Sequence, residues 1–155
     1  MPSFQKFFFE TKGKPITYKG KTLVMVDDIP VKDGETLRLV CESVNSEWKQ
    51  GVSIRIRDKG FFIINGEKVK AHLAVWHNPA HSVFEFTIKA KDKNLEVKNI
   101  WDTGNGVTEL WHNGAAMIVE ETPNGRRYLC NDGHPDENFD DIIFRIERVT
   151  AIDKK

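Results

Sequence analysis

The chain has 155 residues, of which 39% are hydrophobic and 30% charged, and its 23 Lys and Arg residues balance 23 Asp and Glu residues. This length fits a single domain over residues 1–155, and the composition is too apolar for a disordered chain. No apolar run approaches the roughly 20 residues of a spanning helix, so no membrane insertion is expected. Without a basic excess, nucleic-acid binding is disfavoured.

The N-terminal residues carry one lysine and an apolar stretch that is broken by Gln5 and Lys6. They lack the basic start, continuous apolar region and cleavage site of a signal peptide, so a cytoplasmic location is expected. Cys41 and Cys130 lie far apart, each within an apolar run. In a reducing compartment they are expected to be buried free thiols. A disulfide between neighbouring strands is the alternative.

Apolar and polar residues alternate along residues 37–39, 52–57, 84–89 and 95–98, and residues 142–149 are rich in β-branched side chains. This period of two is typical of half-buried strands, because successive side chains point to opposite faces of a sheet. Asn65-Gly66 and Asn124-Gly125 favour two-residue hairpin turns. About ten short strands with long connections predict an all-β domain, an antiparallel β-sandwich of the jelly-roll-like kind.

The inward-facing positions of these strands should form the core. They are Leu37, Leu39, Ile54, Ile56, Phe84, Phe86, Ile88, Leu95, Val97, Phe144 and Ile146. By propensity, residues 115–121 suit one short helix, but Gly114 and Pro123 leave little room for it.

An acidic stretch near the C-terminus, residues 131–141, holds five carboxylates: Asp132, Asp136, Glu137, Asp140 and Asp141. Carboxylates this close repel one another unless solvent or a cation separates them. Calcium suits such a loop because it takes six to eight oxygen ligands from carboxylates, amides and carbonyls. The spacing is not that of an EF-hand, because Glu137 stands where glycine is needed and Ile143 where the bidentate glutamate is needed.

This C-terminal loop and strand resemble those of the calcium-dependent bacterial galactose-binding lectins, which are small β-sandwiches. Asn131-Asp132 resembles an Asn-Asp pair of that family, and Phe144 keeps the spacing of a strand phenylalanine. The resemblance implies Asp132 and Asp140 as side-chain calcium ligands and Asp136 as a carbonyl ligand.

The departure from the family is Phe139, which occupies the position of the first of two adjacent ligands. Either Asp140 and Asp141 form that pair in a loop one residue longer, or one ligand is missing. The candidate metal ligands are therefore Asp132, Asp136, Asp140 and Asp141. The candidate ligand-binding residues are Asn131, Asn138, Trp101 and Asp102.

Two readings without a metal stand beside calcium. In the first, the acidic loop is merely solvated, as charged stretches usually are. In the second, Asp140 and Asp141 cap strand-end amides or pair with Arg126 and Arg127.

Trp76, Trp101 and Trp111 are each followed by a polar residue, and Trp101-Asp102 opens a turn-rich segment. An exposed tryptophan there would stack on the apolar face of a sugar ring. Tryptophan in a small sandwich more often packs in the core, so at most one is expected to be exposed.

Enzymatic readings have less support. His77 and His81, with Glu85 and His112, offer ligands for a cupin-like metal centre, but His77 and His81 lie four residues apart across an Asn-Pro turn. Glu109, Glu120 and Glu121 could form a carboxylate pair for glycoside hydrolysis, although alternating glutamates are usually a solvent face.

We therefore expect a non-catalytic binding module, with calcium as the cofactor and carbohydrate as the ligand that the resemblance implies. The alternatives are a protein-interaction module with a metal-free acidic loop and, less favoured, a cupin-like or hydrolytic enzyme.

Overall fold

The computed structural model describes residues 4–12, 14–56, 59–90, 94–104, 106, 108, 115–132 and 139–149, apart from the side chains of residues 5–7. Strands dominate the described chain. In chain order the elements are α1 (Phe4–Glu10), β1 (Ile16–Tyr18), β2 (Lys21–Leu23), β3 (Asp27–Pro30), β4 (Thr36–Val44), β5 (Lys49–Arg55), β6 (Gly60–Ile64), β7 (Glu67–Lys70), β8 (His72–Trp76), β9 (Val83–Ala90), β10 (Asn94–Asp102), β11 (Ala116–Thr122), β12 (Gly125–Asn131) and β13 (Ile142–Arg148).

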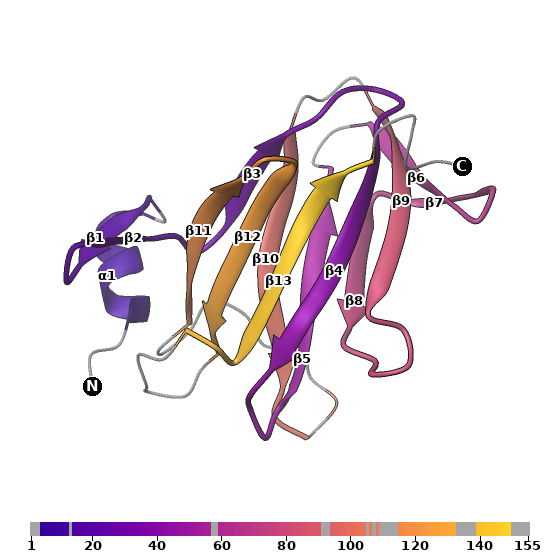
Figure 1. Ribbon diagram of the computed structural model, residues 1–155. Helices are drawn as coiled ribbons and strands as arrows, with labels where there is room; N and C mark the ends of the chain where they lie inside the picture. The colour runs from indigo at the N-terminus through magenta and orange to yellow at the C-terminus, as the bar shows by residue number, and fades with distance from the viewer. Residues whose placement is uncertain are drawn as a thin grey trace.

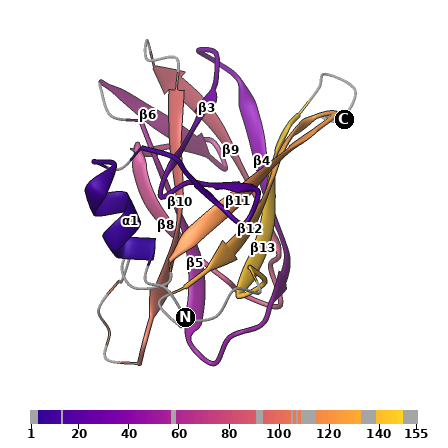
Figure 2. The same ribbon diagram turned by 90° about the vertical axis from the view of Figure 1, so that its left-hand side faces the viewer.

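Two sheets form the layers of a sandwich (Figure 1). The first has four strands in the order β3-β10-β5-β8, and the second has seven in the order β11-β12-β13-β4-β9-β6-β7. Within both sheets every pairing of described strands is antiparallel. The chain changes sheet at most connections between β3 and β11, and the view in Figure 2 shows both layers from the side. The predicted antiparallel sandwich is confirmed, and this repeated crossing distinguishes a jelly-roll-like fold from a meander.

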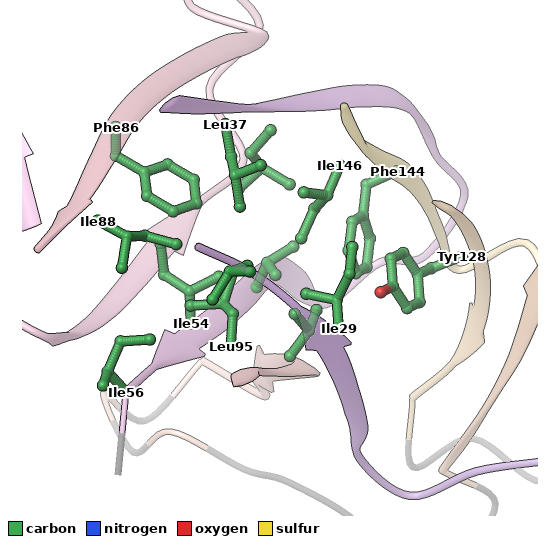
Figure 3. Packing of buried hydrophobic residues seen from close by; sticks show 14 of the residues in the cluster. Ile29, Leu37, Ile54, Ile56, Phe86, Ile88, Leu95, Tyr128, Phe144 and Ile146 are labelled. Atoms are coloured by element: carbon green, nitrogen blue, oxygen red, sulfur yellow. The ribbon is translucent and has the colours of Figure 1, made fainter. Parts of the chain in front are cut away.

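The core lies between the two sheets, where inward side chains from both layers meet (Figure 3). Ten of the predicted core residues are buried, and Phe84 is partly buried against them. Phe84 is more open because β9 has just begun there, beside the connection of residues 77–82. Cys41 and Cys130 are both free thiols; Cys130 is fully buried as predicted, whereas the prediction for Cys41 is wrong because it is only partly buried.

A buried tyrosine joins the two layers. The hydroxyl of Tyr128 on β12 donates a hydrogen bond of 2.7 Å to Asp27 Oδ2 on β3. Arg126 Nη1 donates to the same oxygen at 2.8 Å. Burial and the adjacent Asp27 charge raise the pKa of Tyr128 far above its usual range. The phenol therefore serves as a permanent donor between the sheets.

The N-terminal unit of α1, β1 and β2 packs beside β11 at one edge of the seven-stranded sheet (Figure 1). Val24 and Met117 exchange two backbone hydrogen bonds, of 2.9 and 2.8 Å. A second apolar cluster lies beneath the unit, formed by Phe4, Phe8, Ile16, Leu23, Ala116 and Phe139. Sequence reasoning missed α1 because seven residues are too short for a repeating helical stripe.

Residues 116–122, for which a short helix was the alternative, form β11 and pair along their whole length with β12. Asn65 and Gly66 adopt φ values of 52° and 81°, which confirms the predicted hairpin turn. The second predicted turn is displaced by one residue, because Thr122 pairs with Gly125 and leaves Pro123-Asn124 as the loop. Gly125 is needed for a different reason: a Cβ there would collide with the carbonyl oxygen of Ile146 on β13.

Ion pairs of alternating sign run across the outer face of the seven-stranded sheet. Arg127 lies between Glu42 and Glu120, at 3.1 and 3.0 Å. Arg145 lies between Glu42 and Glu147, at 3.4 and 3.1 Å. Burial alone would raise the pKa of Glu42, but the hydrogen bonds and charges of the two arginines outweigh it and lower that pKa. The pattern is that of a solvent-facing surface whose charges are compensated locally.

Candidate functional site

Four connections meet at one end of the sandwich, which is the lower end in Figure 1. The strand register places the end of β4 beside the starts of β13 and β9, and the start of β5 beside the ends of β10 and β8. The acidic stretch connects β12 and β13 at this same end. Loops held by rigid strands are where binding residues are commonly found.

Asp132, which directly follows β12, is fully buried. Its Oδ2 accepts hydrogen bonds from Ser46 Oγ at 2.6 Å and from Gln50 Nε2 at 2.9 Å. Both donors belong to the β4–β5 region, more than 80 residues earlier in the chain. A buried carboxylate is tolerated only with such partners, because removal from water penalises the charge.

Asp141 and Asp140 approach the same region from the other end of the acidic stretch. Asp141, which is 3% exposed, accepts the backbone N–H of Asp132 at 2.9 Å through Oδ2. Its carbonyl oxygen accepts the N–H of Asn45 at 3.0 Å, and Asp140 Oδ2 accepts from Asn45 Nδ2 at 2.9 Å. The two ends of the acidic stretch thus converge against the β4–β5 connection, with Asp132 and Asp141 in direct contact.

Asn131, the last residue of β12, is fully buried and links the two ends of the acidic stretch to β10. Its side-chain Oδ1 accepts the N–H of Phe139 at 2.7 Å, and its carbonyl oxygen accepts from Asn99 Nδ2 at 2.8 Å. Phe139 has a φ of 53°, a conformation that is strained for a bulky side chain. The hydrogen bond from Asn131 and the burial of the Phe139 ring hold that conformation.

Gln50, like Ser46 and Asn45, is a site residue that sequence reasoning missed. Its Nε2 donates to Asp132 and, at 3.2 Å, to the carbonyl oxygen of Trp48. Its Oε1 is buried and has no hydrogen-bond partner among the described residues. The alternation of side chains along β5 could have identified it. Gln50 lies on the same inward face as Val52 and Ile54, at a position where an apolar residue is expected.

The remaining candidate ligand-binding residues have different placements. Trp101 is fully buried on β10, so its ring is not presented to a ligand, and the interpretation of Trp101 as a stacking platform is wrong. Asp102 Oδ1 accepts the N–H groups of Gly104 and Gly106, at 2.8 and 3.2 Å, and so shapes its own turn. Asp136 and Asn138, like Trp111, lie outside the described residues.

Trp76, the last residue of β8, is partly exposed. It pairs with Gly51, where an added Cβ would lie 2.8 Å from Trp76 Cε3. The missing side chain lets the indole lie against the strand. Lys49 Nζ sits 5.0 Å from the centroid of the ring, so an ammonium group already occupies a cation–π position there.

His77 and His81 line a narrow pocket together with Cys41, beside the β8–β9 connection. Across the described part of the chain, no three His, Cys, Asp or Glu side chains are grouped so as to hold a metal ion. Burial, together with the charge of Glu42, raises the pKa of the Cys41 thiol despite a contact with the Ser43 carbonyl. This weakens its thiolate character, so nothing here supports a nucleophilic or cupin-like centre.

The other carboxylates considered at the sequence level belong to the surface ion pairs. Glu120 pairs with Arg127, and Glu121 pairs with Arg126 at 2.8 Å. Both arginines therefore contact acidic residues other than Asp140 and Asp141. Glu109 and His112 lie outside the described residues.

No family model, curated protein or solved structure matches this chain. The helix among the described residues is too short and too polar to cross a membrane.

Proposed function

We propose that this protein is a non-catalytic binding module that holds a calcium ion at the acidic stretch between β12 and β13. The observation that carries the proposal is the buried Gln50 Oε1, which has no donor among the described residues although its amide lies against the carboxylate of Asp132. A buried acceptor without a partner is costly. A cation bound beside it would remove that cost.

The chemistry of the surrounding side chains suits calcium. Asp132 and Asp141 supply two carboxylates with almost no exposure, and Gln50 supplies an amide oxygen. Asp140 lies at the partly exposed rim, next to Asn45, and is not grouped with these two carboxylates as a third metal ligand. Calcium favours such mixed oxygen sets, whereas transition metals favour nitrogen and sulfur ligands.

The proposed ligand class beside the ion is carbohydrate, which the resemblance of the C-terminal loop implies. What supports it here is the polar rim, where Asn45 is exposed and its amide meets the Asp140 carboxylate. Neighbouring amide and carboxylate groups suit the hydroxyls of a sugar, which both donate and accept hydrogen bonds.

The proposal is tested by thermal unfolding in millimolar calcium, in magnesium and in chelator. A hundredfold excess of calcium over Kd should add about 2.7 kcal/mol of stability, or roughly 5–10 °C in Tm. Magnesium should give a smaller shift because it holds its water more tightly. Galactose added with calcium should raise Tm further, and galactose with chelator should not.

Two kinds of variant sharpen the test. Asp132→Asn and Asp141→Asn keep an acceptor oxygen for the existing hydrogen bonds but remove a charged ligand, so both should lose the calcium response. Gln50→Glu supplies a carboxylate ligand but loses the donor to Asp132. It should therefore be less stable in chelator and show a larger calcium shift than the wild type. Glu120→Gln, on the outer face, is the matched control and should respond normally.

A wild type that melts identically in calcium and in chelator would refute the metal proposal. Gln50→Glu would then be destabilised in both solutions without rescue, because a third carboxylate would be added beside Asp132 with no cation. The acidic stretch would in that case be a brace that ties β12 and β13 to the β4–β5 connection.

A further inference from the structure

A separate cavity of about 220 Å³ lies between the β1–β2 hairpin and Phe139. It is lined by Tyr18, Lys19, Lys21, Leu23 and Phe139. For scale, an apolar cavity of roughly 150 Å³ accommodates benzene. The space is therefore large enough for an aromatic ring but small for a drug-sized molecule.

The floor of this hairpin pocket is apolar and preformed. Leu23 is fully buried and Phe139 is 4% exposed. The Phe4 ring packs against both aromatic walls, edge-on to Tyr18 at 5.1 Å and tilted to Phe139 at 6.0 Å between centroids. Because these rings are held by their neighbours, a ligand would not have to order them, and such preorganisation favours binding.

The backbone conformation of Phe139, which forms one wall of the pocket, is held by a hydrogen bond. Its left-handed backbone is maintained by the hydrogen bond to the buried Asn131 side chain. Strained conformations persist where the surroundings over-determine them, and they concentrate at ligand-contacting positions. With this backbone, the Phe139 ring packs in the same cluster as Leu23 and Phe4.

The mouth of the pocket is cationic. Lys19 and Lys21 flank the tip of the hairpin, both are exposed, and no described carboxylate lines the cavity. Lys19 Nζ also lies 5.4 Å from the centroid of the Tyr18 ring. Over the whole chain, positive and negative residues are equal in number, so this pairing of two ammonium groups with an apolar floor is a local feature.

We propose that the hairpin pocket binds a small aromatic anion, such as an aryl carboxylate or aryl sulfonate. Its ring lies between Tyr18 and Phe139 against Leu23, and its charged group meets Lys19 and Lys21. Apolar walls with a few converging polar groups are the usual composition of a small-molecule site. The described lining residues include none of the proposed ion ligands, so the aromatic anion and the ion would contact different groups.

The test uses naphthalene-1-sulfonate as the probe, with binding to the full chain followed by calorimetry and by amide chemical shifts in chelator. The sulfonate should bind and shift the amides of Tyr18 and Leu23. Inorganic sulfate, which lacks the ring, should produce no shift. Naphthalen-1-ylmethylammonium, which reverses the charge, should bind at least tenfold more weakly.

The double variant Lys19→Glu/Lys21→Glu should lose at least tenfold in sulfonate affinity while its Tm stays near the wild-type value. The matched control is Lys14→Glu/Lys32→Glu, which makes the same charge change at exposed lysines away from the cavity and should bind normally. Equal losses in both double variants, equal binding of the cation and the anion, or an absence of binding would each overturn the proposal.

Discussion

Phe139 combines two features that seldom occur together, because it is a large buried side chain on a left-handed backbone. Left-handed geometry costs an ordinary residue roughly 1–2 kcal/mol, whereas glycine adopts it freely. Substitutions at position 139 can therefore distinguish the stability that the buried ring contributes from the stability that the left-handed backbone costs.

At position 139 we expect the usual order of alanine and glycine to be reversed. Phe139→Ala loses the buried ring, at about 3–5 kcal/mol, and keeps the backbone strain. Phe139→Gly loses the same ring but relieves the strain, so it should be the more stable of the two by about 1 kcal/mol in urea unfolding. At Phe144, in the regular strand β13, alanine should be the better replacement. An alanine variant that is also more stable at 139 would contradict the argument.

The two thiols should differ in reactivity. Cys130 is fully buried, and burial together with the charge of Asp141 raises its pKa well above the ordinary value, whereas Cys41 is only partly covered. Thiolate and access are both required for reaction, so Ellman's reagent should modify Cys41 in the native protein and Cys130 only after denaturation. Cys41→Ser should abolish native labelling. Native labelling at Cys130 would show that this end of the core opens.

At the scale of elements, the N-terminal unit protects an edge. β11 ends the seven-stranded sheet, and an unpaired edge offers backbone donors and acceptors to other chains. Val24 satisfies part of that edge through its two bonds to Met117, while the cluster around Phe4, Phe8 and Leu23 covers the apolar surface beside it. The attachment thus combines few hydrogen bonds with a sizeable apolar contact.

Val24→Pro removes the donor to Met117 without removing the N-terminal unit. The Met117 N–H keeps its acceptor, the Val24 carbonyl, but the bridge then rests on that one bond and should open more often. Hydrogen exchange at the Met117 amide should therefore accelerate at least tenfold, and sedimentation should show more self-association than in the wild type. Val24→Ala keeps the backbone donor and is the control, so it should retain slow exchange. If Val24→Pro and Val24→Ala exchange at the same rate, the bridge does not protect the edge.

Across the whole molecule, the two layers are joined by more than apolar packing. Tyr128, in the middle of β12, and Asp27 link β12 to β3, and Asn99 on β10 donates to the Asn131 carbonyl at the end of β12. These contacts fix how the sheets face each other, since a slip between them would break hydrogen bonds of buried and partly buried groups.

The tyrosine contact should make stability fall in alkali. In the folded state the raised pKa keeps Tyr128 protonated, while in the unfolded chain the phenol ionises near pH 10. The stabilisation is therefore complete below about pH 10 and declines above it by up to about 1.4 kcal/mol per pH unit. Urea unfolding between pH 8 and pH 11 should show the wild type converging on Tyr128→Phe, and parallel curves would exclude the effect.

Much of this fold could be predicted from short stretches of the sequence. The alternation of apolar and polar residues around Ile54 and Val97 predicted the strands and their inward faces. That pattern is local, so it can be recognised from neighbouring residues in the sequence alone. The contacts of the acidic stretch could not be read in this way. Gln50 and Ser46 meet Asp132 only through the pairing of distant strands, and no local period records a partner more than 80 residues away.

The alternating ion pairs on the outer face of the seven-stranded sheet also bear on how fast partners arrive. Glu42, Glu120 and Glu147 alternate with Arg127 and Arg145, so these five charges largely compensate one another over distances shorter than the Debye length, which is about 8 Å at physiological salt. A charged molecule approaching this face therefore meets no sustained attraction that would steer it. Productive encounters through this face would proceed at the rates of neutral surfaces and change little with ionic strength. Electrostatic guidance is instead available where charges of one sign gather, at the two lysines of the β1–β2 hairpin and at the acidic stretch that follows β12.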